Sequence, residues 1–132
     1  MKKIRTALIS VSDKKNLKPL LSVLKRNKIK IISSGGTYKE IKNLKFKCIE
    51  VSKFTNFPEI LDGRVKTLHP KIHAGILNKR KKKSHLNNLK DHNFENIDLV
   101  IVNFYPFENT LTSTKNHKKI LENIDVGGPT MV

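Results

Sequence analysis

Cationic, hydroxyl and glycine residues cluster in the stretch ILDGRVKTLHPKIHAGIL, which runs from Ile60 to Leu77. Arg64 and Lys66 are separated by one residue, and Thr67 follows directly. Guanidinium and ammonium groups neutralise anionic charge, while hydroxyl and backbone N–H groups donate hydrogen bonds to phosphate oxygens. We therefore expect these cations to bind an anionic small molecule.

Two earlier turns carry the same kinds of residue. Ser12, Asp13 and Lys14 follow one short apolar run, and SSGGT, residues 33–37, follows another. SSGGT alone is also typical of a tight turn with a helix cap. Two such turns together with GRVKT favour phosphate binding, although the sequence has neither the P-loop spacing nor GxGxxG.

The histidines of HPKIH lie four residues apart, a spacing found in some metal-binding helices. No third ligand follows at a suitable spacing, so we predict no metal site. His69 stands directly before Pro70, and proline is favoured at the first position of a helix. We expect His69 to start a short helix or to line the binding pocket.

Strand and helix patterns alternate along the chain. Short apolar runs predict strands over residues 4–10, 29–33, 45–51 and 97–105. The last is the most hydrophobic, so we expect it to be central and covered on both faces. Helices are expected after the first strand, capped by Ser12 or Asp13, after SGGT, and over residues 115–123. The first of them should bury Leu17, Leu20, Leu21 and Leu24.

This alternation predicts a single α/β domain, residues 1–132, with a mainly parallel sheet. Ligands bind at the carboxyl ends of the strands in such sheets. That edge would bring together the two turns described above with Asn103 and Tyr105, which end the long hydrophobic run.

The 132 residues carry a formal net charge of +16. Such a charge is typical of nucleic-acid-binding modules, but a small anionic ligand is attracted by the same field. The run KRKKK, residues 79–83, is interpreted as a solvated loop or helix flank. The single cysteine, Cys48, excludes an internal disulfide and is expected to pack in the core of a cytoplasmic protein. We expect neither a signal peptide nor a membrane span, which needs ~18 apolar residues.

Five motifs occur in the order and approximate spacing of a known enzyme family: SVSDK, SSGGT, TNFPEILDGRVKTLHPKIHAGIL, VNFYPF and ENIDVGGPTMV. The chain resembles the amino-terminal part of the bifunctional purine-biosynthesis enzymes that combine phosphoribosylaminoimidazolecarboxamide (AICAR) formyltransferase with IMP cyclohydrolase. The resemblance covers essentially the whole sequence. It implies a methylglyoxal-synthase-like (Rossmann-like) three-layer α/β domain whose C-terminal part is missing. It also implies the final step of IMP synthesis, cyclodehydration of 5-formamido-imidazole-4-carboxamide ribonucleotide.

The resemblance implies the binding residues motif by motif. The first two turns would hold the phosphate and ribose side of the nucleotide, residues 64–67 would close over it, and two later pairs would border the base. The implied substrate-binding residues are Ser12, Asp13, Lys14, Ser34, Gly35, Gly36, Thr37, Arg64, Val65, Lys66, Thr67, Val102, Asn103, Asp125 and Val126.

Ring closure needs a cation or N–H donors at the formyl oxygen, which gains negative charge, and a base near the carboxamide nitrogen. Lys66 is the catalytic candidate for the first role, and Asp125, assisted by Tyr105, for the second. Other interpretations stay open: Lys66 as a phosphate clamp only, Tyr105 as a core aromatic, and Asp125 as a helix cap. The step requires no metal or organic cofactor, and 10-formyltetrahydrofolate would serve only the absent formyltransferase domain.

The family's sequence continues beyond GGPTMV into a helix with a Lys-Asn pair, whose lysine is usually assigned the leading acid–base or oxyanion role. Because this sequence stops at Val132, we expect weak or absent turnover and an exposed sheet edge from these residues alone. The expected partners are a purine nucleotide, the C-terminal formyltransferase domain of a longer parent and a second copy in a homodimer, without membrane or specific nucleic acid. Two alternatives are another methylglyoxal-synthase-like enzyme or regulatory domain, and a basic nucleic-acid-binding module.

Overall fold

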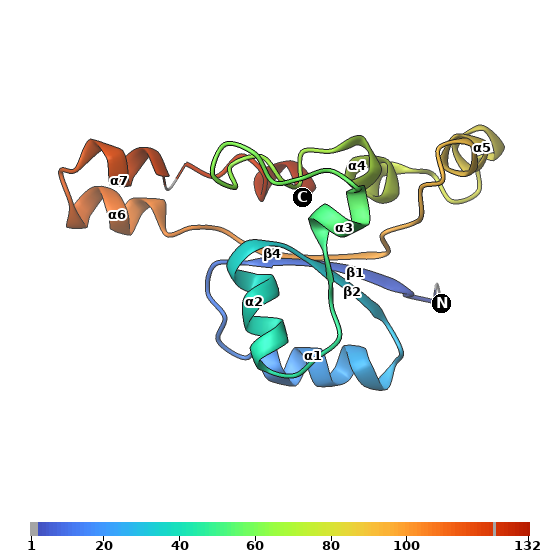
Figure 1. Ribbon diagram of the computed structural model, residues 1–132, viewed down its shortest axis with the longest axis horizontal. Helices are drawn as coiled ribbons and strands as arrows, with labels where there is room; N and C mark the ends of the chain where they lie inside the picture. Colours follow the sequence, from blue (N-terminus) through green and yellow to red (C-terminus); the bar gives the residue numbers. More distant parts are fainter. Residues whose placement is uncertain (1–2, 123) are drawn as a thin grey trace.

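The computed structural model describes residues 3–122 and 124–132. Within these residues, four parallel strands form one sheet in the order β3-β2-β1-β4 (Figure 1). The predicted mainly parallel α/β domain is therefore confirmed. The strands are β1 (Thr6–Val11), β2 (Lys30–Ser33), β3 (Ile49–Glu50) and β4 (Leu99–Asn103).

Helices cover both faces of the sheet, which gives three layers (Figure 1). One face carries α1 (Leu17–Arg26) and α2 (Gly35–Asn43). The other carries α3 (Val51–Thr55), α4 (Pro70–Leu77) and the short 3-10 helix η1 (Pro129–Met131). Three further helices flank this body in Figure 1: α5 (Lys83–Asp91), α6 (Phe107–Ser113) and α7 (His117–Glu122).

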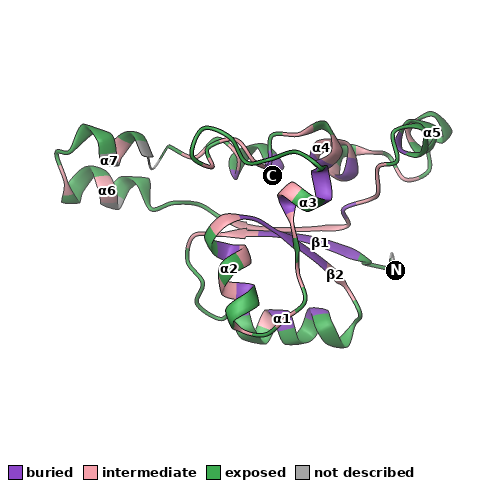
Figure 2. Ribbon diagram, in the orientation of Figure 1, coloured by how far each residue is buried: buried purple, intermediate pink, exposed green. Residues whose placement is uncertain are grey.

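β1 is one of two inner strands, and its side chains pack on both faces of the sheet. Ala7 and Ile9 pack against α1 and α2, while Leu8 between them packs against α3 and α4, as side chains alternate along a strand. All three are fully buried, and Figure 2 shows β1 and β2 as the most buried strands. The prediction that the most hydrophobic run would be central was wrong: β4 forms an edge, and most of it is half-buried.

The leucine stripe of α1 forms as predicted. Leu17, Leu21 and Leu24 are buried, Leu20 packs against them in part, and Pro19 lies in the first turn, where a missing N–H costs nothing. The predicted cap was wrong, however. The helix begins after Asn16, which is left-handed and makes no side-chain cap bond. The Asp13 carboxylate instead accepts a hydrogen bond from the N–H of Lys15 at 2.9 Å.

Two other predicted elements have different bounds. The third strand is reduced to Ile49–Glu50, because Val51 and Phe54 are spaced for one face of α3 and pack there against the core. The predicted polar helix is α7, and Asn123 lies outside the described residues. Cys48 is half-buried against the core, as expected, and burial raises the pKa of its thiol to about 12.

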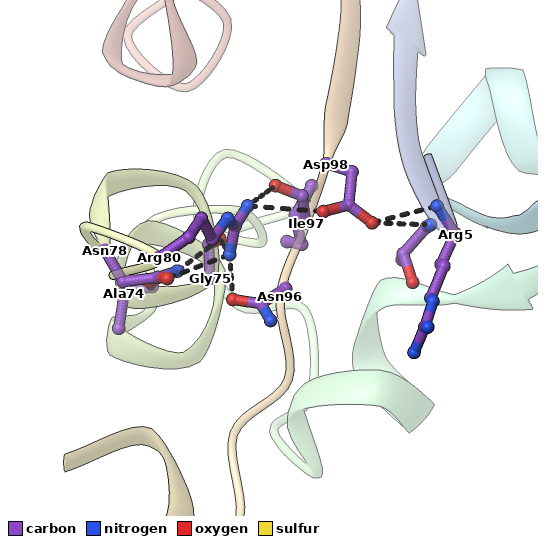
Figure 3. A network of polar contacts seen from close by, with 9 residues as sticks. Arg5, Ala74, Gly75, Asn78, Arg80, Asn96, Ile97 and Asp98 are labelled. Atoms are coloured by element: carbon purple, nitrogen blue, oxygen red, sulfur yellow. Dashed lines mark hydrogen bonds and ion pairs between the residues drawn. The ribbon is translucent and has the colours of Figure 1, made fainter. Parts of the chain in front are cut away.

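The run KRKKK is exposed and flanks α5, as predicted, except at Arg80. Arg80 instead joins a network of polar contacts (Figure 3). Its guanidinium donates to the backbone oxygens of Gly75 (3.2 Å) and Ile97 (2.6 Å) and to the side chain of Asn96. It also lies 3.5 Å from the carboxylate of Asp98. The arginine therefore joins the end of α4 to the segment that enters β4.

Candidate functional site

The loops after β1, β2 and β4 leave the sheet at one edge, because the strands are parallel. Asn103, the last residue of β4, fixes the loop after β1. Its side-chain oxygen accepts from the N–H groups of Ser12 (2.5 Å) and Asp13 (3.1 Å), and its Nδ2 donates to the Asp13 carbonyl (2.9 Å). The Asn103 amide thus holds a neighbouring loop, a contact that the sequence did not reveal.

Thr37 ties the first turn of α2 to the end of β1. Its hydroxyl accepts from the N–H of Val11 (3.0 Å) and donates to the carbonyl of the same residue (2.9 Å). The side chain is only 5% exposed. Thr37 and Asn103 therefore hold the β1–α1 loop from two sides, which limits the reorganisation needed when a ligand binds.

The N-terminus of α2 offers free donors at the same edge. Gly35 opens the helix at φ +53°, a conformation that favours glycine. The first N–H groups of a helix have no intrahelical acceptor, and the helix dipole places partial positive charge there. The predicted phosphate-binding turn thus has the backbone that an anion needs.

Residues 60–67 form a tight turn that presents the two predicted cations. Ile60 and Val65 pair through both backbone hydrogen bonds, at 3.1 and 3.3 Å. Between them, residues 61–63 adopt φ values of 53°, 54° and 80°, a left-handed run that costs free energy at the non-glycine positions. Arg64, at the end of this turn, is exposed, and Lys66 is half-buried.

Two ammonium groups lie beside the glycine pair of α2. A methyl group placed on Gly35 would lie 3.0 Å from Lys66 Nζ, and one placed on Gly36 would lie 3.8 Å from Lys14 Nζ. Lys14 Nζ also donates to the carbonyl of Ser12 at 3.1 Å. The charges of both lysines therefore add to the positive end of the helix dipole.

Residues 125–128 close the site from the other end of the chain. One carboxylate oxygen of Asp125 accepts from the N–H of Gly128 at 3.0 Å. This bond is typical of an aspartate that caps a helix, one of the interpretations left open for Asp125. A methyl group on Gly127 would lie 2.8 Å from the Thr67 hydroxyl, so glycine permits this close approach. Thr67 itself is buried.

Two adjoining cavities result, of about 120 and 590 Å³. Both are lined by Arg64, Lys66, Tyr105 and Asp125. The smaller is polar, whereas the larger adds the apolar side chains of Leu121, Ile124 and Val126. The predicted residues that line the smaller cavity are Ser12, Lys14, Gly36, Thr37, Arg64, Lys66, Thr67, Asn103, Tyr105 and Asp125.

Five predicted binding residues line neither cavity: Asp13, Ser34, Gly35, Val65 and Val102. Ser34 is buried, Val65 pairs with Ile60, and Val102 packs against the core on the α3 and α4 side. The Val102 side chain points from the face of the sheet toward the layer of α3 and α4, whereas the cavities lie at the ends of the strands.

Several lining residues were not predicted. Val11, Gly127 and Gly128 line the smaller cavity, and Asp62, Gly63, Leu121 and Ile124 line the larger. The glycine pair after Asp125 was visible as the motif DVGG. Leu121 and Ile124 carried no such signal, because isolated apolar residues in a polar segment are common.

His69 adopts the predicted role at the start of α4. Its Nδ1 accepts from the N–H of Lys71 at 3.1 Å. Burial and the neighbouring Lys71 charge lower the pKa of His69 below its usual value, so the neutral acceptor form is favoured. No cluster of three or more potential metal-ligating side chains was found among the described residues. Nor does any helix in the part of the chain that the structure describes have the length and apolarity to span a membrane.

Comparison with known proteins agrees with this geometry. The model of the MGS-like domain family matches residues 16–130, and the chain belongs to that family. It is 50% identical to the bifunctional purine biosynthesis protein PurH of Clostridioides difficile over 97% of its length, and 51% identical to PurH of Prochlorococcus marinus (strain MIT 9301) over 96%. The chain spans about a quarter of the length of these curated relatives.

A solved structure supports the same fold. The crystal structure of ForH superposes with a TM-score of 0.81 at 31% identity, over 97% of this chain and 65% of that one. The expected methylglyoxal-synthase-like architecture is thereby confirmed.

Proposed function

We propose that the chain is an IMP cyclohydrolase domain, which closes 5-formamido-imidazole-4-carboxamide ribonucleotide to IMP with release of water. The observation that carries the proposal is that Gly36 and Arg64, from separate turns, line one polar cavity that adjoins a larger, partly apolar one. The relatives named for purine biosynthesis support this choice over other phosphorylated ligands.

The smaller cavity is suited to the phosphate end of the nucleotide. Its volume is about 120 Å³, and the N-terminal turn of α2, Lys14 and Lys66 supply N–H donors and positive charge. The larger cavity suits the heterocycle, because Ile124 and Val126 offer apolar contacts while Tyr105 and Asp125 offer hydrogen bonds.

The chemistry proceeds between the two ends. The carboxamide nitrogen forms a bond to the formyl carbon and loses one proton, while the formyl oxygen becomes a hydroxyl group. That hydroxyl then leaves with the proton of the formamido nitrogen as water. Lys66 lines both cavities and stabilises the developing oxyanion, while Asp125 and Tyr105 orient or deprotonate the carboxamide. Holding the two groups together supplies an effective molarity of up to ~10⁵ M or more.

The proposal extends to the parent protein. The step needs no metal or organic cofactor, and a formyltransferase using 10-formyltetrahydrofolate occupies sequence outside this chain in a cytoplasmic homodimer. Support comes from the length of the relatives, which extends far beyond the matched region.

Titration of the chain with IMP tests the proposal without depending on turnover. We expect saturable one-to-one binding that Arg64→Gln weakens about tenfold or more, because a hydrogen bond to a charged group contributes about 1.5–3 kcal/mol. Lys81→Gln, on the exposed basic run, is the matched control and should leave binding unchanged. Absence of IMP binding, or equal loss in both variants, contradicts the proposal.

The role of Lys66 needs a second readout. In a version of the chain extended through the family's Lys-Asn pair, Lys66→Gln should slow ring closure more than it weakens IMP binding if the ammonium stabilises the oxyanion. If Lys66 only holds the phosphate, the variant should weaken IMP binding more than it slows ring closure.

A further inference from the structure

A second basic surface lies at the opposite ends of the strands from the candidate site, where β2 begins. It is a groove of about 830 Å³, here called the lysine groove. Six lysines line it: Lys25, Lys28, Lys30, Lys42, Lys45 and Lys47. Its apolar lining includes Ile29, Ile31, Phe46 and Ile49. The groove shares no residue with either cavity of the candidate site.

The groove follows from how β3 joins the sheet. The register pairs Ile32 with Ile49 and Ser33 with Glu50, so the first half of β2 has no partner in β3. Residues 45–49 cross α1 before the chain rises to α3 (Figure 1). Lys25 Nζ lies 5.7 Å from the Phe46 ring, which confirms that this segment contacts α1.

The charges around the groove are largely uncompensated. No acidic side chain lines it. Lys30 pairs with Glu95 at 2.6 Å, but none of the other five lysines forms an ion pair with a described residue. Like charges at this density repel one another, so an anion that binds between them lowers the electrostatic free energy.

The apolar lining restricts the kind of anion. A second copy of this chain is disfavoured in this groove, because the chain offers only 11 acidic residues against 27 lysines and arginines. Single-stranded nucleic acid binds through several stacking platforms along a groove, whereas Phe46 is the one aromatic residue among the lining residues and already has Lys25 over its ring. Isoleucines suit aliphatic side chains, and the five residues 45–49 give room for an extended peptide of similar length.

We propose that the lysine groove binds an extended acidic segment of a partner protein, in which carboxylates alternate with aliphatic side chains. The aliphatic groups contact Ile29, Phe46 and Ile49, and the carboxylates pair with the surrounding lysines. This interaction is independent of the nucleotide site, so either proposal can fail without the other.

Binding of a labelled peptide, acetyl-Glu-Val-Glu-Val-Glu, tests the proposal by fluorescence anisotropy. The groove variant is Lys25→Gln/Lys42→Gln/Lys47→Gln, three exposed positions with negative φ. The matched control, Lys81→Gln/Lys82→Gln/Lys83→Gln, removes the same charge from an exposed run outside the groove. We expect the groove variant to weaken binding about tenfold, because it removes three surface ion pairs, and the control to weaken it less than twofold.

Three outcomes overturn the proposal. Equal weakening by both variants means that net charge alone attracts the peptide. Equal affinity for acetyl-Glu-Ser-Glu-Ser-Glu means that the apolar lining takes no part. Tighter binding of an oligodeoxythymidine of about ten nucleotides, with displacement of the peptide, assigns the groove to nucleic acid. An unchanged midpoint of urea unfolding for the groove variant verifies that its fold is intact.

Discussion

Replacing Arg80 with methionine should destabilise the fold far more than its place in a basic run suggests. Methionine keeps much of the apolar stem but removes the guanidinium that contacts Gly75, Ile97 and Asp98 (Figure 3). The Arg80 side chain is 21% exposed and that of Asp98 only 8%, so both charges are largely withdrawn from water. Loss of one partner leaves the other buried with less compensation.

The remaining contacts set the magnitude. Asp98 still accepts from the N–H groups of Arg5 (2.9 Å) and Thr6 (3.2 Å). The Gly75 carbonyl still accepts from the N–H of Ile97 at 3.0 Å. Breaking a buried pair costs about 3–5 kcal/mol, and these surviving donors place the expected loss near the lower end, about 3 kcal/mol.

Urea denaturation followed by circular dichroism measures this loss. At a slope of about 2 kcal/mol per molar urea, the midpoint should fall by roughly 1.5 M with the slope unchanged. Arg26→Met is the matched control: Arg26 is exposed in the last turn of α1, and the change should stay within about 0.5 kcal/mol. If Arg80→Met unfolds at the midpoint of the unchanged chain, the network does not stabilise the fold.

Three further predictions concern the site and its supports. Gly35→Ala should weaken IMP binding about tenfold, because alanine is strained at a φ of +53° and its methyl group would lie 3.0 Å from Lys66 Nζ. Unchanged affinity in calorimetry would contradict this expectation. Asn103→Ala should weaken IMP binding, because the N–H groups of Ser12 and Asp13 lose their acceptor and the loop after β1 is freed. Unchanged affinity in calorimetry would show that the amide does not position the loop. The lowered pKa of His69 predicts that stability declines as pH falls below about 6.5, because protonated Nδ1 cannot accept from Lys71. His69→Asn retains a capping group without titrating, so its urea midpoint should lose this part of the pH dependence, and the same decline in both chains would exclude the histidine as its cause.

The sequence predicts the layers of the fold well because local patterns determine them. The α1 leucines recur at the helical period, and Ala7, Leu8 and Ile9 form a run that is buried on both sides. The position of β4 in the sheet was not predictable in the same way. A continuous apolar run indicates burial of both faces but does not say whether another strand lies alongside, so an edge strand gives the same pattern.

The site was predictable where chemistry is local and not where it depends on distant contacts. The glycine pair and the cations of residues 64–67 are recognisable as anion ligands from their own types. The side chain of Asn103, in contrast, serves a loop at the other end of the chain, and Arg80 differs from its basic neighbours only through residues near β4. No pattern among neighbouring residues in the sequence identifies the partners of Asn103 or of Arg80.

The sequence separation of the site's parts has a consequence for biosynthesis. Ser12 and Asn103 are joined by a hydrogen bond although 91 residues separate them. During translation, the turns at residues 12–14 and 34–37 emerge early but remain unclamped until β4 has left the ribosome and paired with β1. The nascent chain can therefore assemble the edges of this cavity only after residue 103 has emerged, and closing so long a loop makes that assembly a slow, non-local event.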